Sequence, residues 1–207
     1  MNLNTELLAK LDSLDTRNAA LAMLSENPEL IDQTICEKLM EIIAQPESIE
    51  NTNRFASLIE ETEDPAFIQP LIDKVSTAKL EKAPWLADYL YALVMLLDER
   101  EEAYPAEDTL VHRLGDWLLH TGGGEISWKS GDILSNLSNP NTQDYLTKGA
   151  LDQRLFHLTR IACLSGIMNL HREHAPALLE KLLNDPNEEI RESAKRAEEF
   201  LQRASTD

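Results

Sequence analysis

The stretch that decides the fold of this chain is APALLEKLLNDPNEEIRESAKRAEEFL, residues 175–201. Its apolar side chains recur at helical spacing on both sides of a tight turn, residues 184–187, and so predict two amphipathic helices. We expect Pro186 to begin the second helix and Asp185 to cap it, because a proline at a helix start lacks only an N–H that has no partner there. Neither helix can bury its apolar stripe alone. The pair therefore predicts one unit of a helical solenoid.

Helical periodicity continues along the whole chain, and no window shows the strict alternation of apolar and polar residues that is typical of strands. All nine prolines fall at or near predicted helix starts or in connections, whereas a proline in a helix interior would cost about 3 kcal/mol. The fold class is therefore all-α. The predicted helices span about residues 4–11, 16–24, 28–44, 48–61, 65–75, 84–98, 107–120, 126–137, 142–150, 153–171, 176–184 and 186–203.

A family resemblance is carried by Asp185, Pro186, Asn187, Ile190, Arg191, Ala194 and Ala197. This order resembles the second-helix signature of HEAT repeats, in which an Asp-Pro turn precedes an aliphatic residue, an arginine and spaced alanines. Residues 67–97 and 110–137 look like a looser form seen in small bacterial HEAT-like proteins. The resemblance covers about residues 64–202 and implies a HEAT/armadillo-like solenoid.

Stacked helix pairs of roughly 30 to 45 residues would form a right-handed α-α superhelix of about five to six helix pairs. We expect a single solenoid domain over residues 1–207. Within it, residues 1–63 would form irregular N-terminal helices or a cap, and residues 64–203 would form HEAT-like helix pairs.

The charge balance indicates the class of partner. The chain has 37 acidic and 19 basic side chains, a net charge of −18, and residues 41–108 alone carry 16 acidic against 5 basic ones. A negative field of this size repels the phosphates of nucleic acid but steers a basic protein into contact. We therefore predict a basic protein partner and no nucleic acid. The alternative is that the acidity confers only solubility.

Cysteine usage and hydropathy bear on location. Cys36 and Cys163 lie in apolar helical patterns 127 residues apart, which favours buried thiols over a disulfide. The first nine residues show no export signal. The longest apolar run, residues 89–97, is far shorter than the roughly 20 residues that span a bilayer. We predict a cytoplasmic protein that does not bind membranes.

No cluster of residues predicts catalysis, cofactor binding or a metal site, and we expect a protein that is not an enzyme. His171 and His174 are three residues apart and could share a helix face, but a metal needs at least one more ligand. The run Gly122 to Gly124 follows a predicted helix rather than a strand. It lacks the ending of a nucleotide-binding loop, so Gly122 is expected to end the helix in the left-handed conformation.

The predicted partner-binding residues are Trp85, Asp88, Tyr89, Asp132 and Glu192. Trp85 and Tyr89 are four residues apart, with Asp88 beside them, and lie off the leucine stripe of their helix. Aligning the helices places the three acidic residues in one row, an acidic ridge on the concave face. Aromatic rings beside carboxylates suit recognition of lysine or arginine on a partner. The alternative is that both rings pack between repeats and the acidic residues are merely solvated.

We interpret the chain as a non-enzymatic protein–protein interaction module, a scaffold or assembly factor with an acidic concave surface. Some proteins with HEAT-like folds are immunity factors, so one alternative is neutralisation of a secreted bacterial toxin by occlusion of its active site. A second alternative is a hydrolase or lyase whose site is assembled across repeats. The oligomeric state stays open.

Overall fold

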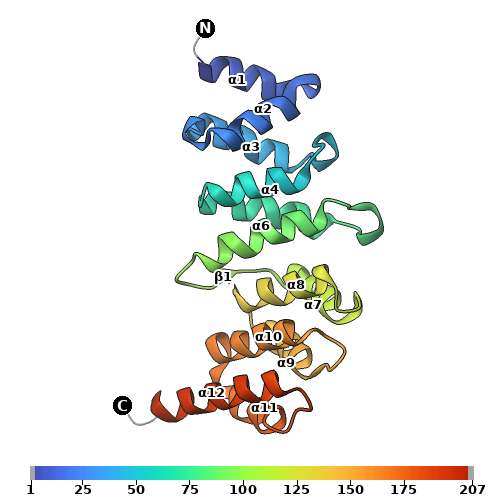
Figure 1. Ribbon diagram of the computed structural model, residues 1–207, viewed down its shortest axis with the longest axis vertical. Coiled ribbons are helices and arrows are strands. Elements are labelled where there is room, and N and C mark those ends of the chain that lie inside the picture. Colours follow the sequence, from blue (N-terminus) through green and yellow to red (C-terminus); the bar gives the residue numbers. More distant parts are fainter. Residues whose placement is uncertain (1–2, 205–207) are drawn as a thin grey trace. The chain divides into compact units, whose positions relative to one another are not determined.

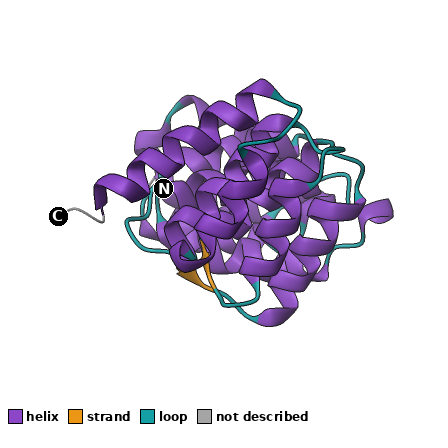
Figure 2. Ribbon diagram, turned by 90° about the horizontal axis from the view of Figure 1, so that it is seen from below, coloured by secondary structure: helices purple, strands orange, loops and turns teal. Residues whose placement is uncertain are grey.

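The computed structural model describes residues 3–204, and helices dominate it (Figures 1 and 2). Each of the twelve predicted helices is present among these residues, so the all-α class is confirmed. They are α1 (Leu3–Asp12), α2 (Leu14–Glu26), α3 (Gln33–Ile43), α4 (Thr52–Glu61), α5 (Ile68–Thr77), α6 (Leu86–Asp98), α7 (Asp108–His120), α8 (Glu125–Ser135), α9 (Thr142–Leu151), α10 (His157–Leu170), α11 (Ala175–Leu182) and α12 (Glu188–Ala204).

The chain divides into two compact units, residues 1–100 and 101–207. In the first unit, α2, α4 and α6 pack in one layer and α1, α3 and α5 in another. In the second, α8, α10 and α12 form one layer and α7, α9 and α11 the other. Within each unit the two layers are joined by consecutive helices, such as α1 with α2 and α7 with α8. From α5 onward, this is the pairing of consecutive helices that the sequence predicts.

Prolines set the spacing of helices in the first unit. Pro28, Pro46, Pro65 and Pro84 recur every 18 or 19 residues, and each precedes a helix. The first three begin the short 3-10 helices Pro28–Leu30, Pro46–Ser48 and Pro65–Phe67. The predicted helices that started at or near these positions therefore begin three to five residues later as α-helices. A proline fixes the backbone angle that a turn or first helical position needs.

All seven glycines lie in the second unit. Gly122 and Gly123 have φ angles of 80° and 77°, so the predicted left-handed end of α7 is confirmed. Gly149, in α9, lets α10 approach closely, since a Cβ atom there would lie 2.7 Å from the Cys163 sulfur. The strands β1 (Tyr104–Pro105) and β2 (Leu137–Ser138) pair in parallel. At two residues each they are too short to produce the alternation that predicts strands.

The turn between α11 and α12 corrects one expectation. The side chain of Asn187, not Asp185, caps α12, because Asn187 Oδ1 accepts hydrogen bonds from the N–H groups of Glu189 at 2.9 Å and Ile190 at 3.2 Å. Asp185 is buried and binds the Arg160 guanidinium through both carboxylate oxygens. The proline lies two residues before the helix start. The side chain predicted to cap a helix therefore fixes the turn to α10 instead.

Cys36 and Cys163 are buried free thiols, as predicted. Burial raises the pKa of Cys163 to about 12, so this thiol stays protonated and unreactive at neutral pH. None of the helices described between residues 3 and 204 is long and apolar enough to cross a membrane.

Candidate functional site

The structure places Trp85 and Tyr89 in the core of the first unit, with 4% and 0% of their surfaces exposed. Their rings contact each other at a centroid distance of 5.0 Å, and the Tyr89 hydroxyl donates to the Ile43 carbonyl at 3.3 Å. Burial raises the pKa of Tyr89 far above its usual value. The expectation that these rings lie on a binding surface is therefore wrong. Both α4 and α5 cover α6, so a residue off its leucine stripe is still buried.

The three acidic residues of the predicted ridge are at least partly exposed. Asp88 is half-buried and accepts hydrogen bonds from the side chains of Thr52 and Asn53, which tie α6 to the start of α4. Asp132 lies half-buried on α8, and Glu192 lies exposed on α12 with its carboxylate 2.6 Å from Lys195. Because α10 packs between α8 and α12, Asp132 and Glu192 belong to one layer without being neighbours. Their role in binding stays a prediction.

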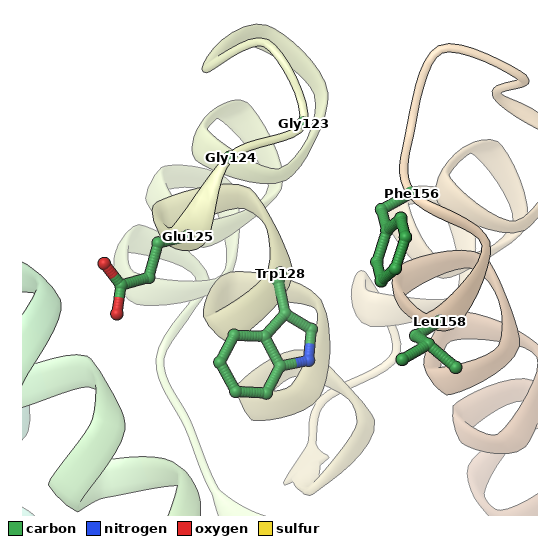
Figure 3. Close-up of a pocket in the computed structure, with 6 residues that line it drawn as sticks. All are labelled: Gly123, Gly124, Glu125, Trp128, Phe156 and Leu158. Carbon is green, nitrogen blue, oxygen red and sulfur yellow. The ribbon is translucent and has the colours of Figure 1, made fainter.

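An open pocket of about 430 Å³ lies in the second unit, between the starts of α8 and α10 (Figure 3). The Trp128 indole forms one wall, and the side chains of Phe156 and Leu158 face it from the other (Figure 3). Phe156 and Leu158 are each 52% exposed, a large fraction for side chains of this size. The lining residues are Gly123, Gly124, Glu125, Trp128, Phe156 and Leu158.

Local packing fixes the walls of this pocket. Phe156 precedes α10 in an extended conformation, while Leu155 before it and Thr159 after it are buried. The glycine turn after α7 packs against this segment, since a Cβ atom on Gly123 would lie 3.2 Å from the Arg154 carbonyl oxygen. The glycine run therefore brings the start of α8 beside the start of α10. The burial of Leu155 and Thr159 on either side holds the Phe156 and Leu158 side chains outward.

Carboxylates surround the pocket. Glu125 projects from the side of α8 remote from Phe156, and its carboxylate lies 2.5 Å from the ammonium of Lys129 (Figure 3). Glu189 reaches His157, the residue between Phe156 and Leu158 in sequence, with 2.6 Å between Oε2 and Nε2. Asp132 follows Trp128 by one helical turn and so lies on the same face of α8. The pocket is thus an apolar hollow within an acidic surface.

Sequence reasoning missed Trp128, Phe156 and Leu158. Leu158 lies off the buried stripe of α10, which includes Cys163 and Ile167, whereas Phe156 has the spacing of this stripe but precedes the helix in an extended conformation. Trp128 lies in a helix whose neighbouring residues are polar or charged. The available signal was a large apolar side chain that no helical stripe could bury.

The two histidines considered for metal binding have other partners. The Thr142 hydroxyl donates to the Asn139 carbonyl at 2.8 Å and therefore accepts from His171 Nε2, 2.7 Å away. Burial lowers the pKa of His171. His174 is exposed and lies 3.4 Å from the Glu173 carboxylate. In residues 3–204, no three histidine, cysteine or acidic side chains gather where they could hold a metal ion.

The comparison with solved structures establishes the fold. The chain is similar to a designed armadillo repeat protein, with a TM-score of 0.55 and 17% identity over 95% of this chain and 98% of that one. It is also similar to human deoxyhypusine hydroxylase in complex with glycerol, with a TM-score of 0.33 and 16% identity over 97% of this chain and 94% of that one, a likeness too low to carry an argument. No protein-family model and no curated protein sequence matches the chain. The predicted HEAT/armadillo-like solenoid is confirmed, and the likeness concerns fold alone.

Proposed function

We propose that this chain is a protein-interaction module, a scaffold or assembly factor that acts in the cytoplasm and binds a basic protein partner. The binding surface in the second unit is the layer of α8, α10 and α12. The observation that carries the proposal is the open apolar pocket on this layer. Exposed aromatic and leucine side chains around a hollow are typical of interface hot spots, where truncation of one side chain costs about 2 kcal/mol or more of binding free energy.

Net charge supports a basic partner. The first unit holds 19 acidic and 8 basic residues and the second holds 18 and 11, so both units are negative. Such a field raises the rate of association with a positively charged protein, and salt screens it. An apolar hot spot inside an acidic surface combines affinity from burial with selection by charge.

Affinity capture with the immobilised full chain tests this proposal. A basic protein from the native lysate should bind at about 50 mM salt and elute as salt rises, since the screening length shortens to about 8 Å at physiological ionic strength. Its purified form should bind a variant with Glu125→Gln, Asp132→Asn and Glu189→Gln several-fold more weakly.

Retention of no protein would contradict the proposal, and so would a partner whose affinity does not change with salt. Co-expression with the retained protein then tests the narrower role. Rescue of growth would identify neutralisation of a basic toxin, and unchanged growth would favour the scaffold role.

A further inference from the structure

We infer that the pocket between α8 and α10 takes one large apolar side chain, aromatic or leucine, from a partner segment that carries lysine or arginine on both sides of it. The inference rests on the proposed function and deepens it. It specifies where the partner docks and which side chains the docking segment must have.

The lining of the pocket favours an apolar occupant. Its two walls are the Trp128 indole on α8 and the Phe156 and Leu158 side chains at the start of α10, which face each other (Figure 3). The one charged residue of the lining, Glu125, directs its carboxylate away from the hollow, where Lys129 binds it. A cation inside the pocket would lose water and gain no carboxylate, whereas an apolar side chain gains contacts on both sides.

The surroundings of the pocket favour basic flanks on the partner. Glu125 lies beyond the Trp128 wall, and Glu189 contacts His157 behind the opposite wall. Both carboxylates are largely exposed, and Asp132 lies one turn beyond Trp128 on α8. The exposed cation of the adjoining segment, Arg154, is held by the Asp152 carboxylate at 2.6 Å. Positive charges on either side of the inserted side chain therefore approach two exposed carboxylates, Glu125 and Glu189, whose present partners are Lys129 and His157.

The pocket is preorganised for this role. Arg160, one turn into α10, donates from Nε to the Ala150 carbonyl at 2.9 Å and binds Asp185, so the start of the helix is fixed to its neighbours. The turn at Gly123 packs tightly against this segment, since a Cβ atom there would lie 3.2 Å from the Arg154 carbonyl oxygen. Walls held in this way need little ordering when a partner binds, which favours affinity.

The test uses the ¹⁵N-labelled full chain and the peptide acetyl-KKLFKK-amide. The Trp128 indole N–H signal is the readout, and the indoles of Trp85 and Trp117 serve as internal references because both are buried. We expect KKLFKK to shift the Trp128 signal in a saturable manner. The control peptides acetyl-KKAAKK-amide and acetyl-EELFEE-amide should bind at least about tenfold more weakly, a difference of 1.4 kcal/mol in binding free energy.

A matched pair of variants completes the test. Phe156→Ser removes part of one wall while supplying a favourable helix-capping residue, so it should fold and yet bind KKLFKK about tenfold more weakly. Leu158→Ser should behave alike. Leu14→Ser removes a side chain that is 63% exposed in the first unit and should leave binding unchanged. Equal binding of KKLFKK and KKAAKK, or of the wild type and Phe156→Ser, would overturn the inference.

The outcomes separate this inference from the proposed function. A captured basic protein that binds wild type and Phe156→Ser equally would show that it does not dock in the pocket. That result overturns the inference and leaves the proposed function standing. A Trp128 signal that shifts with protein concentration in the absence of peptide shows that a second copy occupies the pocket, and this overturns the inference too. The absence of any salt-sensitive basic partner overturns the proposed function itself.

Discussion

Two buried arginines, Arg17 in the first unit and Arg160 in the second, hold the same place in the fold. Each is the fourth residue of the second helix of a pair, α2 or α10. Each donates from Nε, over 2.9 Å, to the carbonyl of the penultimate residue of the helix before it, Leu11 or Ala150. The shared geometry shows that the units are built on one repeat plan despite their different sequences.

The remaining contacts of the two arginines differ. Arg17 reaches the neutral side chains of Ser48 and, at 3.5 Å, Gln45, in the turn before α4. Arg160 reaches the Asp185 carboxylate in the equivalent turn before α12. Removing the carboxylate of a buried ion pair leaves an uncompensated charge and costs about 3 to 5 kcal/mol, whereas removing one neutral acceptor of a charged donor costs about 1.5 to 3 kcal/mol. The arginine at this position of the repeat therefore contributes less to stability in the first unit than in the second.

The largest expected effect comes from removing the partner of each buried arginine. Asp185→Ala should lower the free energy of unfolding of the second unit by about 3 to 5 kcal/mol, and Ser48→Ala should lower that of the first by about 1.5 to 3 kcal/mol. Urea unfolding should be followed by fluorescence of Trp85 for the first unit and Trp117 for the second, with the other tryptophans replaced by phenylalanine. Losses of equal size would show that the two arginine links are equivalent.

The next effect concerns close packing, which relies on glycine in the second unit. Gly149→Ala should destabilise that unit by about 1 to 3 kcal/mol, because the new methyl would lie 2.7 Å from the Cys163 sulfur and 2.9 Å from Leu118 Cδ2. The control is Gly124→Ser, since no atom lies within 4 Å of a Cβ placed there. A stabilised Gly149→Ala variant would mean that these helices are free to separate.

Acidification should affect the stability of the two units differently. Burial favours a raised pKa for Asp185, but hydrogen bonds from Arg160 and the Asn187 N–H outweigh it and hold the pKa below its usual value. Asp185 therefore stabilises the second unit above about pH 4, the range of an unfolded aspartate, and this contribution is lost as pH falls through the folded pKa. In the first unit, burial and the nearby Glu61 raise the pKa of Glu60, which has the opposite effect on stability.

The measurement is the urea midpoint of each unit between pH 5 and pH 2.5. The midpoint of the second unit should fall more steeply than that of the first, and Asp185→Asn should flatten its slope. A wild-type slope unchanged by Asp185→Asn would assign the acid sensitivity to other carboxylates.

The smallest expected effect has the opposite sign. Phe156→Ser should raise the free energy of unfolding of the second unit by about 0.5 kcal/mol, because Phe156 stands at the start of α10 without a capping hydrogen bond from its side chain. Thermal unfolding of this variant beside Leu14→Ser checks the prediction. A clear loss of stability would show that the Phe156 ring stabilises the second unit and is not placed there for binding alone.

The helices could be predicted from sequence because each carries a local periodic signal, even the irregular ones before residue 64. The surface residues could not be predicted in the same way. Tyr89 lies off a leucine stripe, but it begins the longest apolar run of the chain, residues 89–97 of α6. A helix that is apolar on nearly all sides is buried on nearly all sides. Trp128 and Phe156 meet only through the packing of α8 on α10, which no local pattern encodes. Trp128 is a partly exposed aromatic ring with the carboxylates Glu125 and Asp132 on its helix, as predicted for Trp85, and the Lys129 ammonium also lies 5.8 Å from its ring centroid.

Hydrogen exchange of the full chain with and without its captured partner tests the central claim most directly, since it compares the two units in one experiment. The account predicts that protection on binding centres on residues 123–132 and 156–162, the starts of α8 and α10 around the pocket. Protection confined to the first unit, with these segments unchanged, would contradict it.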